Sequence, residues 1–233
     1  MILLLALLAL PALLCAADAP KTYTCLFSPS YMVIDGKLDE FAWDLAPWSD
    51  PFVDIEGNLK PAPKYLTRVK MLWDDRALYI AAELEEPQVW ATIAKRDDVI
   101  FHDNDLEVFL DPDGDNHKYG ELEINALNTQ WDLFLPKPYK DNGHPLNEWN
   151  IDGLQTAVRV NGTLNNPADI DSGWTVEMAL PWRGLEMCMD HNRPPQPGEY
   201  WRINFSRVEW DTQVIDGKYV KVPDKPEFNW VWS

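Results

Sequence analysis

Acidic side chains alternate with apolar ones in the segment 98–136, DVIFHDNDLEVFLDPDGDNHKYGELEINALNTQWDLFLP. In a strand, a period of two places Glu107 on one face and its apolar neighbours on the other. The same alternation separates Glu123 and Asn125 from the apolar residues of the next run, close to Trp131 in sequence. Carboxylate and amide groups can hold the hydroxyls of a ligand, so this strip is a candidate polar binding surface. The alternative is an ordinary solvated sheet face.

The elements that must position this strip are the two strands of a hairpin, 106–110 and 122–126, joined by the turn 111–116. Further alternating runs at 67–73, 77–84, 174–180 and 201–210 predict more strands. A short helix is expected at 40–45, with Asp39 as N-cap. This pattern predicts an all-β protein, an antiparallel β-sandwich of two packed sheets, jelly-roll-like, with short helical turns.

Composition narrows the choice of partners. A formal net charge of -18 argues against nucleic acid and anionic membrane surfaces, since their phosphates require Lys and Arg. The 12 Trp exceed what a core usually requires, so some are expected on a binding surface. A chain of 233 residues is long enough for one large β domain and short for two.

The first 17 residues form an apolar run with small residues near its end, which is typical of an export signal. We therefore expect an exported protein (periplasmic, secreted or cell-surface) with a single domain over 18–233. The remaining sequence contains no segment typical of a membrane-spanning helix. Cys25 and Cys188 would remain after signal removal, and an exported compartment permits a disulfide between them without the sequence requiring it.

No catalytic signature stands out, so the chain is predicted not to be an enzyme. The histidines fall in expected loops without the HExxH spacing of a zinc site, and a Gly-x-Ser-x-Gly elbow is absent. Carboxylates are abundant, yet no two stand out as the pair that a glycosidase needs.

Several motifs occur in an order shared with a known family. They are DNDLEVFLDPDGDN followed by YGELEINALNT, Ile34–Asp39 followed by Trp43, Gly173–Trp182, and Trp201–Arg207. With these motifs the chain resembles carbohydrate-binding module family 9. In that family the opening segment places a buried Trp, so the resemblance implies that Trp43 lies in the core. The resemblance implies a β-sandwich that recognises a glycan or sugar end in carbohydrate catabolism, near glycan-degrading enzymes or envelope components. Relatives continue past the matching Trp-Ser with another strand, so we expect this domain to lack the family's last strand.

The resemblance also implies site residues. Two aromatic rings clamp a terminal sugar in the family, and the matching positions are Phe101 and Trp232, or Trp230 if the register slips by two. Glu107 matches a carboxylate that accepts hydrogen bonds from sugar hydroxyls, and Asn125 lies in the matching polar strand. Two positions depart from the family pattern: Phe101 replaces a Trp, and Glu123 replaces a basic residue. Glu123 remains a candidate ligand-binding residue.

Calcium is a further candidate. Asp111, Asp113 and Asp115 alternate in the hairpin turn, and relatives hold structural calcium through loop carboxylates. An EF-hand is excluded because its twelfth position, which needs Glu, is Leu122.

Two other functional classes stay open at this point. Some proteins of the same sandwich superfamily bind haem for electron transfer between Met and His ligands. Here His102 has four possible Met partners, which are Met71, Met178, Met187 and Met189. A purely structural sandwich without a ligand is the other alternative.

Overall fold

The computed structural model describes residues 20–189 and 193–233. The expected export signal at 1–17 lies outside the described residues. Within the described part, no helix is long and apolar enough to cross a membrane.

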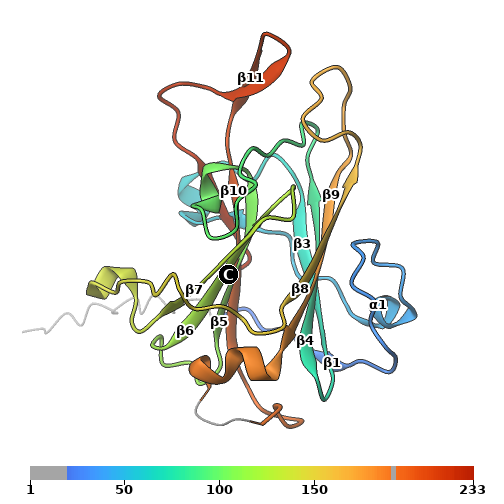
Figure 1. Cartoon of the computed structure of the whole chain (residues 1–233), viewed down its shortest axis with the longest axis vertical. Coiled ribbons are helices and arrows are strands. Elements are labelled where there is room, and N and C mark those ends of the chain that lie inside the picture. Colours follow the sequence, from blue (N-terminus) through green and yellow to red (C-terminus); the bar gives the residue numbers. More distant parts are fainter. Residues whose placement is uncertain (1–19, 190–192) are drawn as a thin grey trace, which may run out of the picture.

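Two packed sheets form the body of the molecule (Figure 1). The five-stranded sheet has the order β1 (Leu26–Phe27), β3 (Thr67–Trp73), β4 (Ala77–Glu85), β9 (Gly173–Pro181), β8 (Gln155–Asn161). The six-stranded sheet has the order β2 (Val53–Asp54), β13 (Phe228–Val231), β10 (Arg202–Glu209), β5 (Asp105–Asp111), β6 (Tyr119–Asn125), β7 (Gln130–Leu135). Only the pairing of β1 with β3 is parallel among these described strands. The predicted antiparallel β-sandwich is confirmed.

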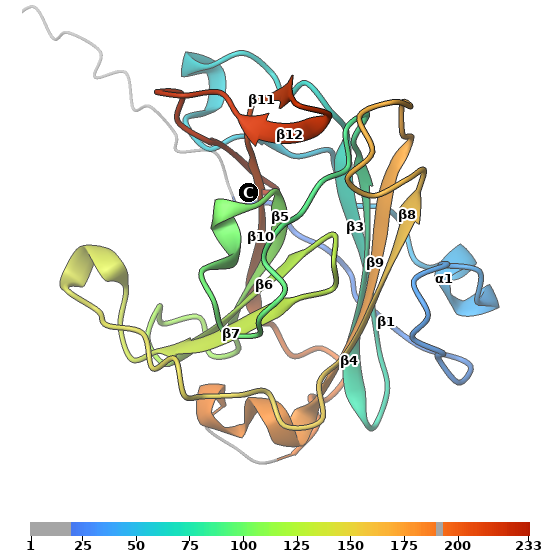
Figure 2. The same ribbon diagram turned by 45° about the horizontal axis from the view of Figure 1, so that its top comes forward.

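The remaining elements are short. They are the hairpin β11 (Thr212–Ile215) with β12 (Lys218–Lys221), the helix α1 (Phe41–Leu45), and the 3-10 turns η1 (Gly57–Leu59), η2 (Ile100–His102), η3 (Tyr139–Asp141) and η4 (Trp182–Cys188). Figure 2 shows η2 and η3 on the side of the six-stranded sheet that faces away from the five-stranded sheet. The short helix predicted at 40–45 is α1, but its N-cap is Glu40 rather than Asp39, and no side chain caps it.

The core lies between the two sheets and follows from the alternation in each strand. On β5, Leu106, Val108 and Leu110 are at most 1 % exposed and point toward the five-stranded sheet. On β9, Trp174 and Met178 belong to the same apolar cluster. Because successive side chains point to opposite faces, burying these residues turns the acidic residues of β5 away from the core.

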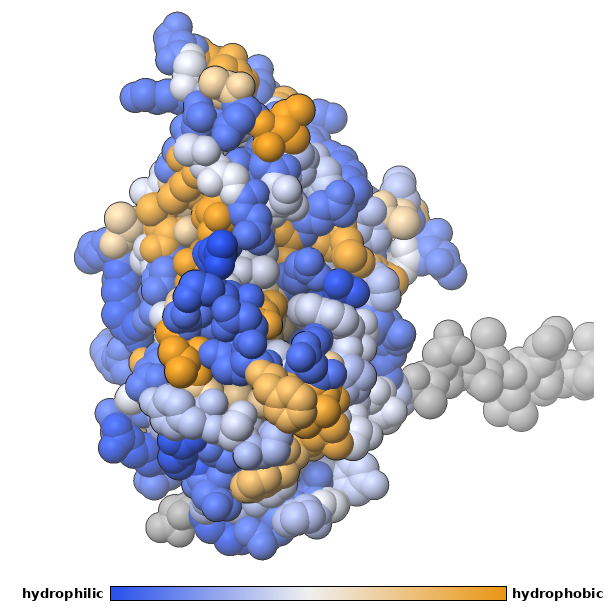
Figure 3. All heavy atoms as spheres, turned by 90° about the vertical axis from the view of Figure 1, so that its right-hand side faces the viewer, coloured by the Kyte–Doolittle hydropathy of each residue, from blue (hydrophilic) through white to orange (hydrophobic). Residues whose placement is uncertain are grey.

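A second, smaller apolar cluster fixes α1 on the outer side of the five-stranded sheet. Trp43 is 1 % exposed there, as predicted. Its indole Nε1 donates to Glu177 Oε1 at 2.8 Å, and Glu177 Oε2 accepts the backbone N–H groups of Asp35 and Gly36. One buried carboxylate on β9 therefore anchors both the helix and the turn before it. Figure 3 shows small apolar groups among hydrophilic residues on this side of the molecule.

Cys25 and Cys188 are both free thiols. Burial raises the pKa of each thiol to about 12. Since the thiolate is the reactive form, both cysteines are poor nucleophiles in the folded protein.

Candidate functional site

The acidic strip lies on the outer face of the six-stranded sheet, the face turned away from the core. In the β5–β6 pairing Glu107 is directly opposite Glu123, and Phe109 is opposite Glu121. Residues opposite each other in an antiparallel pair share a face, so these side chains and that of Asp105 point the same way. The structure therefore confirms the hairpin and the outward direction of its acidic residues.

These carboxyl groups are much less exposed than a solvated strip would be. Glu107 is 8 % exposed and Glu123 is 2 % exposed. Burial is the largest cause of raised pKa values in the group, and repulsion between its members adds to it in Glu121 and Glu123. The pKa of Glu107 rises to about 7, that of Glu121 to about 8, and that of Glu123 to about 10. A group that is partly protonated near neutral pH can both donate and accept hydrogen bonds.

Two half-buried aromatic rings border the carboxylates. Phe101 in η2 and Trp131 on β7 stack with ring centroids 6.5 Å apart and planes 26° apart. Trp131 is directly opposite Glu123 in the β6–β7 pairing. The η2 turn is held in place because Phe101 N donates to Glu123 Oε2 at 2.9 Å and Trp210 Nε1 donates to Phe101 O at 2.9 Å.

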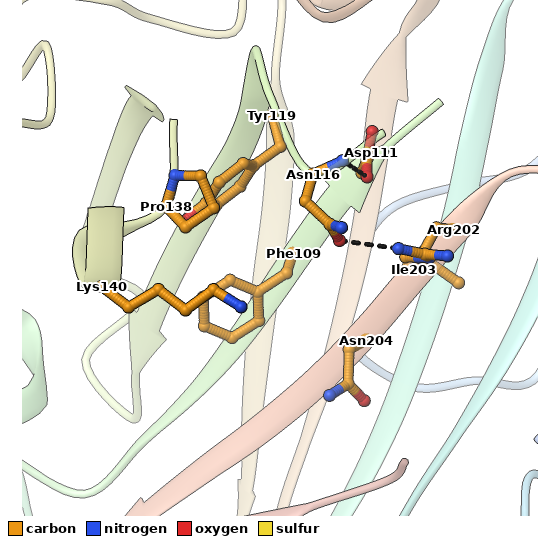
Figure 4. A pocket seen from close by; sticks show the side chains of 9 residues that line it. All are labelled: Phe109, Asp111, Asn116, Tyr119, Pro138, Lys140, Arg202, Ile203 and Asn204. Atoms are coloured by element: carbon orange, nitrogen blue, oxygen red, sulfur yellow. Dashed lines mark hydrogen bonds between the residues drawn. The ribbon is translucent and has the colours of Figure 1, made fainter. Parts of the chain in front are cut away.

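A cavity of about 310 Å³ opens at the other end of the same strip (Figure 4). Its apolar wall includes Phe109 and Tyr119, and Lys140, Arg202 and Asn204 bring polar groups to it. The cavity adjoins the acidic strip, because Phe109 in its wall is paired with Glu121 of the strip. Apolar walls with a few polar groups are typical of small-molecule sites.

Asn125, a candidate sugar ligand, is fully buried, and its amide is used within the protein. Its Nδ2 donates to Ile93 O and Asp103 Oδ2, while its Oδ1 accepts from the backbone N–H groups of Leu127 and Thr129. The structure thus gives Asn125 a role in shaping the β6–β7 turn and fastening the loop before η2.

The structure places both candidate C-terminal clamp residues in the core. Trp232 is 4 % exposed and its ring centroid lies 6.2 Å from that of Phe205. Trp230 is 1 % exposed and its ring faces the Arg207 guanidinium at 5.2 Å. Both rings are nearly fully buried in this arrangement, and the ring that stacks on Phe101 is that of Trp131.

Asp111, Asp113 and Asp115 do gather in the hairpin turn, with one oxygen of each within 4.8 Å of the others. Several of their oxygens already accept backbone N–H groups, as Asp111 does from Gly114 and Asn116. These bonds account for the turn without an ion, and calcium there stays a prediction.

The haem alternative gains no support from the residue placement. Met71, Met178 and Met189 pack in the core between the sheets, whereas His102 is exposed at the end of η2. Met187 is 51 % exposed on η4.

Asp105, Glu121 and Trp131 also belong to the candidate site. Alternation was the signal for the two acids, since Asp105 and Glu107 share a face, as do Glu121 and Glu123. Trp131 was noted only as close in sequence, and its pairing opposite Glu123 places it on the same face. Phe109 was also on this face, but its role as a cavity wall depends on the η3 loop and β10.

A β-sandwich with acceptor groups and aromatic rings on an outer sheet face is the architecture of a ligand-binding domain. The chain belongs to the carbohydrate family 9 binding domain-like family, whose model matches residues 34–231. This is a family of non-catalytic binding modules, so the predicted family and the predicted lack of enzyme activity are confirmed.

Curated relatives and solved structures resemble this chain. Endo-1,4-beta-xylanase A of Thermoanaerobacterium saccharolyticum is 26% identical over 66% of this chain, and Exoglucanase XynX of Acetivibrio thermocellus is 25% identical over 79%. The matches cover 11% and 13% of those proteins, so the chain spans about a tenth of their length.

Among solved structures, a carbohydrate binding module family 9 from Caldicellulosiruptor kristjanssonii in complex with cellotriose has a TM-score of 0.54 and 18% identity. That match covers 88% of this chain and 82% of the other. A putative carbohydrate-binding protein from Bacteroides uniformis has a TM-score of 0.61 and 13% identity, covering 90% and 88%. These likenesses establish the shared fold.

Proposed function

We propose that the outer face of the six-stranded sheet binds the end of a carbohydrate chain without catalysis. The observation that carries the proposal is the stacked pair of Phe101 and Trp131 beside a row of carboxyl groups. Aromatic rings match the apolar C–H face of a pyranose, and carboxylates accept hydrogen bonds from its hydroxyls. Family membership and the sugar-bound relatives support the same assignment.

The residues divide the work as follows. Phe101 and Trp131 supply the stacking surface, and Glu123 positions Phe101 through its backbone N–H. Glu107 and Glu121 accept hydroxyl hydrogen bonds. The adjoining cavity beside Phe109 receives the next part of the sugar.

We expect Trp131→Ala to weaken binding of cellotriose or glucose about 30-fold, which corresponds to about 2 kcal/mol for an aromatic anchor at a binding site. Isothermal titration calorimetry measures this directly, after a glycan array has ranked other sugars. The matched control is Trp232→Phe, which changes a core indole and should leave affinity within about twofold, since such a substitution acts on packing.

Two results would overturn the proposal in different ways. Wild-type protein that binds no sugar on the array removes the carbohydrate assignment. Sugar binding that Trp232→Phe abolishes and Trp131→Ala leaves intact moves the stacking surface to the C-terminal strand.

We also propose that the protein is exported and works beside glycan-degrading enzymes. The apolar run at 1–17 and the names of the two curated relatives support this context. Intact-mass measurement of protein recovered outside the cytoplasm of the native host should show a chain that begins near Asp18. A chain that keeps Met1 and stays in the cytoplasm contradicts export.

A further inference from the structure

The cavity beside Phe109 is basic, in contrast to the acidic strip that it adjoins. Two cationic side chains line it, Lys140 from η3 and Arg202 from the first position of β10. In the view of Figure 4, Phe109 lies between these two side chains. The chain has 38 acidic and 20 basic residues, so two cations in one cavity are a local feature that the overall composition does not predict.

Both cations are available to a ligand. Neither forms an ion pair with a carboxylate among residues 20–189 and 193–233. Arg202 Nη1 donates to Asn116 Oδ1 at 2.7 Å, and this neutral acceptor fixes one side of the guanidinium. The other Arg202 nitrogens and the Lys140 ammonium donate no hydrogen bond to any described residue.

One carboxylate, that of Asp111, also lines the cavity and is directly opposite Arg202 in the β5–β10 pairing. Both of its oxygens are used by the hairpin turn, because Oδ1 accepts from Gly114 N and Oδ2 accepts from Asn116 N. Asp111 is 7 % exposed, whereas Arg202 and Lys140 are exposed side chains. A ligand in the cavity therefore meets two positive charges, while the lining carboxylate is turned into the loop.

The loop that carries Lys140 is fixed over the sheet. On one side of Lys140 in sequence, Tyr139 Oη donates to Glu121 Oε2 at 3.1 Å. On the other side, Gly143 N donates to Pro138 O at 3.0 Å, which closes the turn. The backbone at Lys140 is thus held in place before a ligand binds, and this lowers the cost of ordering the site.

We infer that this cavity binds the carboxylate of a uronic acid unit, so that the preferred ligand is an acidic glycan. A guanidinium offers paired N–H groups that match a planar carboxylate, and the Lys140 ammonium adds a point charge. The inference rests on the proposed function, in which Phe101 and Trp131 hold the neighbouring sugar unit.

The charges also set the direction of the ligand on the sheet. Phe109 follows Glu107 by two residues, about 7 Å along β5, so neighbouring units of one glycan can reach the rings and the cavity. The acidic strip beside the rings repels a second anion, whereas the cavity attracts it. The neutral unit therefore lies on the rings and the acidic unit lies in the cavity.

Calorimetry on the full chain tests this with two disaccharides that differ at one carbon. They are cellobiose and cellobiouronic acid, in which a carboxylate replaces the CH2OH group of one unit. At neutral pH and low salt we expect wild type to bind the acid about tenfold more tightly, as charge-assisted hydrogen bonds allow. Arg202→Gln should reduce this preference to about twofold or less, and Arg202→Lys, which keeps only the charge, should retain part of it.

The matched control is Arg159→Gln, an exposed position on β8 in the other sheet. It changes the net charge equally and should keep the preference of about tenfold, because a distant exposed charge is screened by salt. If Arg202 had only a structural role, Arg202→Gln would weaken the binding of both disaccharides together and leave their ratio unchanged.

Three results would overturn the inference. Cellobiouronic acid that binds wild type no more tightly than cellobiose removes it and leaves the proposed function intact. A preference that survives in both Arg202→Gln and Lys140→Gln also removes it, since the carboxylate then binds elsewhere. Wild type that binds neither disaccharide removes it as well, and the array of neutral sugars then decides the proposed function separately.

Discussion

Arg207→Met should lower the free energy of unfolding by about 3–5 kcal/mol, the usual cost of breaking a buried ion pair by removing one partner. Arg207 is fully buried, and its Nη2 lies 2.7 Å from Glu86 Oε2 and 2.8 Å from Glu209 Oε2. Nη1 donates to Thr67 Oγ1 and to Glu85 O. Methionine fills similar volume but leaves two buried carboxyl groups without their cation.

Chemical denaturation at constant pH measures this loss. Arg183→Met is the matched control: its partner is Asp152, both side chains are largely exposed, and such pairs contribute about 0–1 kcal/mol. Adding Glu86→Gln and Glu209→Gln to Arg207→Met should recover part of the loss, since it removes the unpaired charges. A loss below about 1 kcal/mol for Arg207→Met would show that the three residues are not a structural unit.

Stability should fall as pH rises from about 5 to about 7 in excess chelator. Burial is the largest cause that raises the pKa of Glu107 to about 7, of Glu121 to about 8 and of Glu123 to about 10. In the unfolded chain these groups ionise near their ordinary pKa of about 4.3. Between these values the folded state binds more protons than the unfolded state, so raising the pH favours unfolding. The stabilisation from these protonated groups is complete below the pKa of the unfolded chain, and it is lost as pH rises through the pKa values of the folded protein.

For each extra proton bound in the folded state, the free energy of unfolding falls by about 1.4 kcal/mol per pH unit. One such proton therefore accounts for about 3 kcal/mol between about pH 5 and 7. Glu121→Gln should flatten the slope, because the amide has no proton to lose. The control is Glu186→Gln at an exposed position of η4, which should leave the slope unchanged. Denaturant midpoints at several pH values give the comparison, and stability that rises over this range would contradict the assignment.

Much of the fold follows from local pattern. Alternation in 106–110 and 122–126, with turn residues between, is sufficient to predict β5, β6 and the face on which Glu107 and Glu123 lie. The ordered motifs then identify the family, which the match over residues 34–231 confirms. Trp43 was also predictable as a core residue, because the family resemblance places a buried Trp at this position.

The site was only partly predictable, because side-chain exposure depends on what packs against each strand. Trp131 and Trp232 are both Trp near strand ends, and nothing local separates the half-buried ring from the core ring. Asn125 looks like a ligand-binding amide until the loops that satisfy it are in place. Such long-range contacts have no signature in the spacing of residues.

The sequence by itself thus determined the strands, their inward and outward faces and the family, since these depend on period and on ordered motifs. Only the tertiary structure decided which aromatic ring faces the carboxylates, that Asp105 is fully enclosed beside Glu107 and Glu123, and that Arg207 is buried between two acids. The physical reason is that burial and electrostatic coupling arise from segments far apart in the chain, which meet only when the sheets pack.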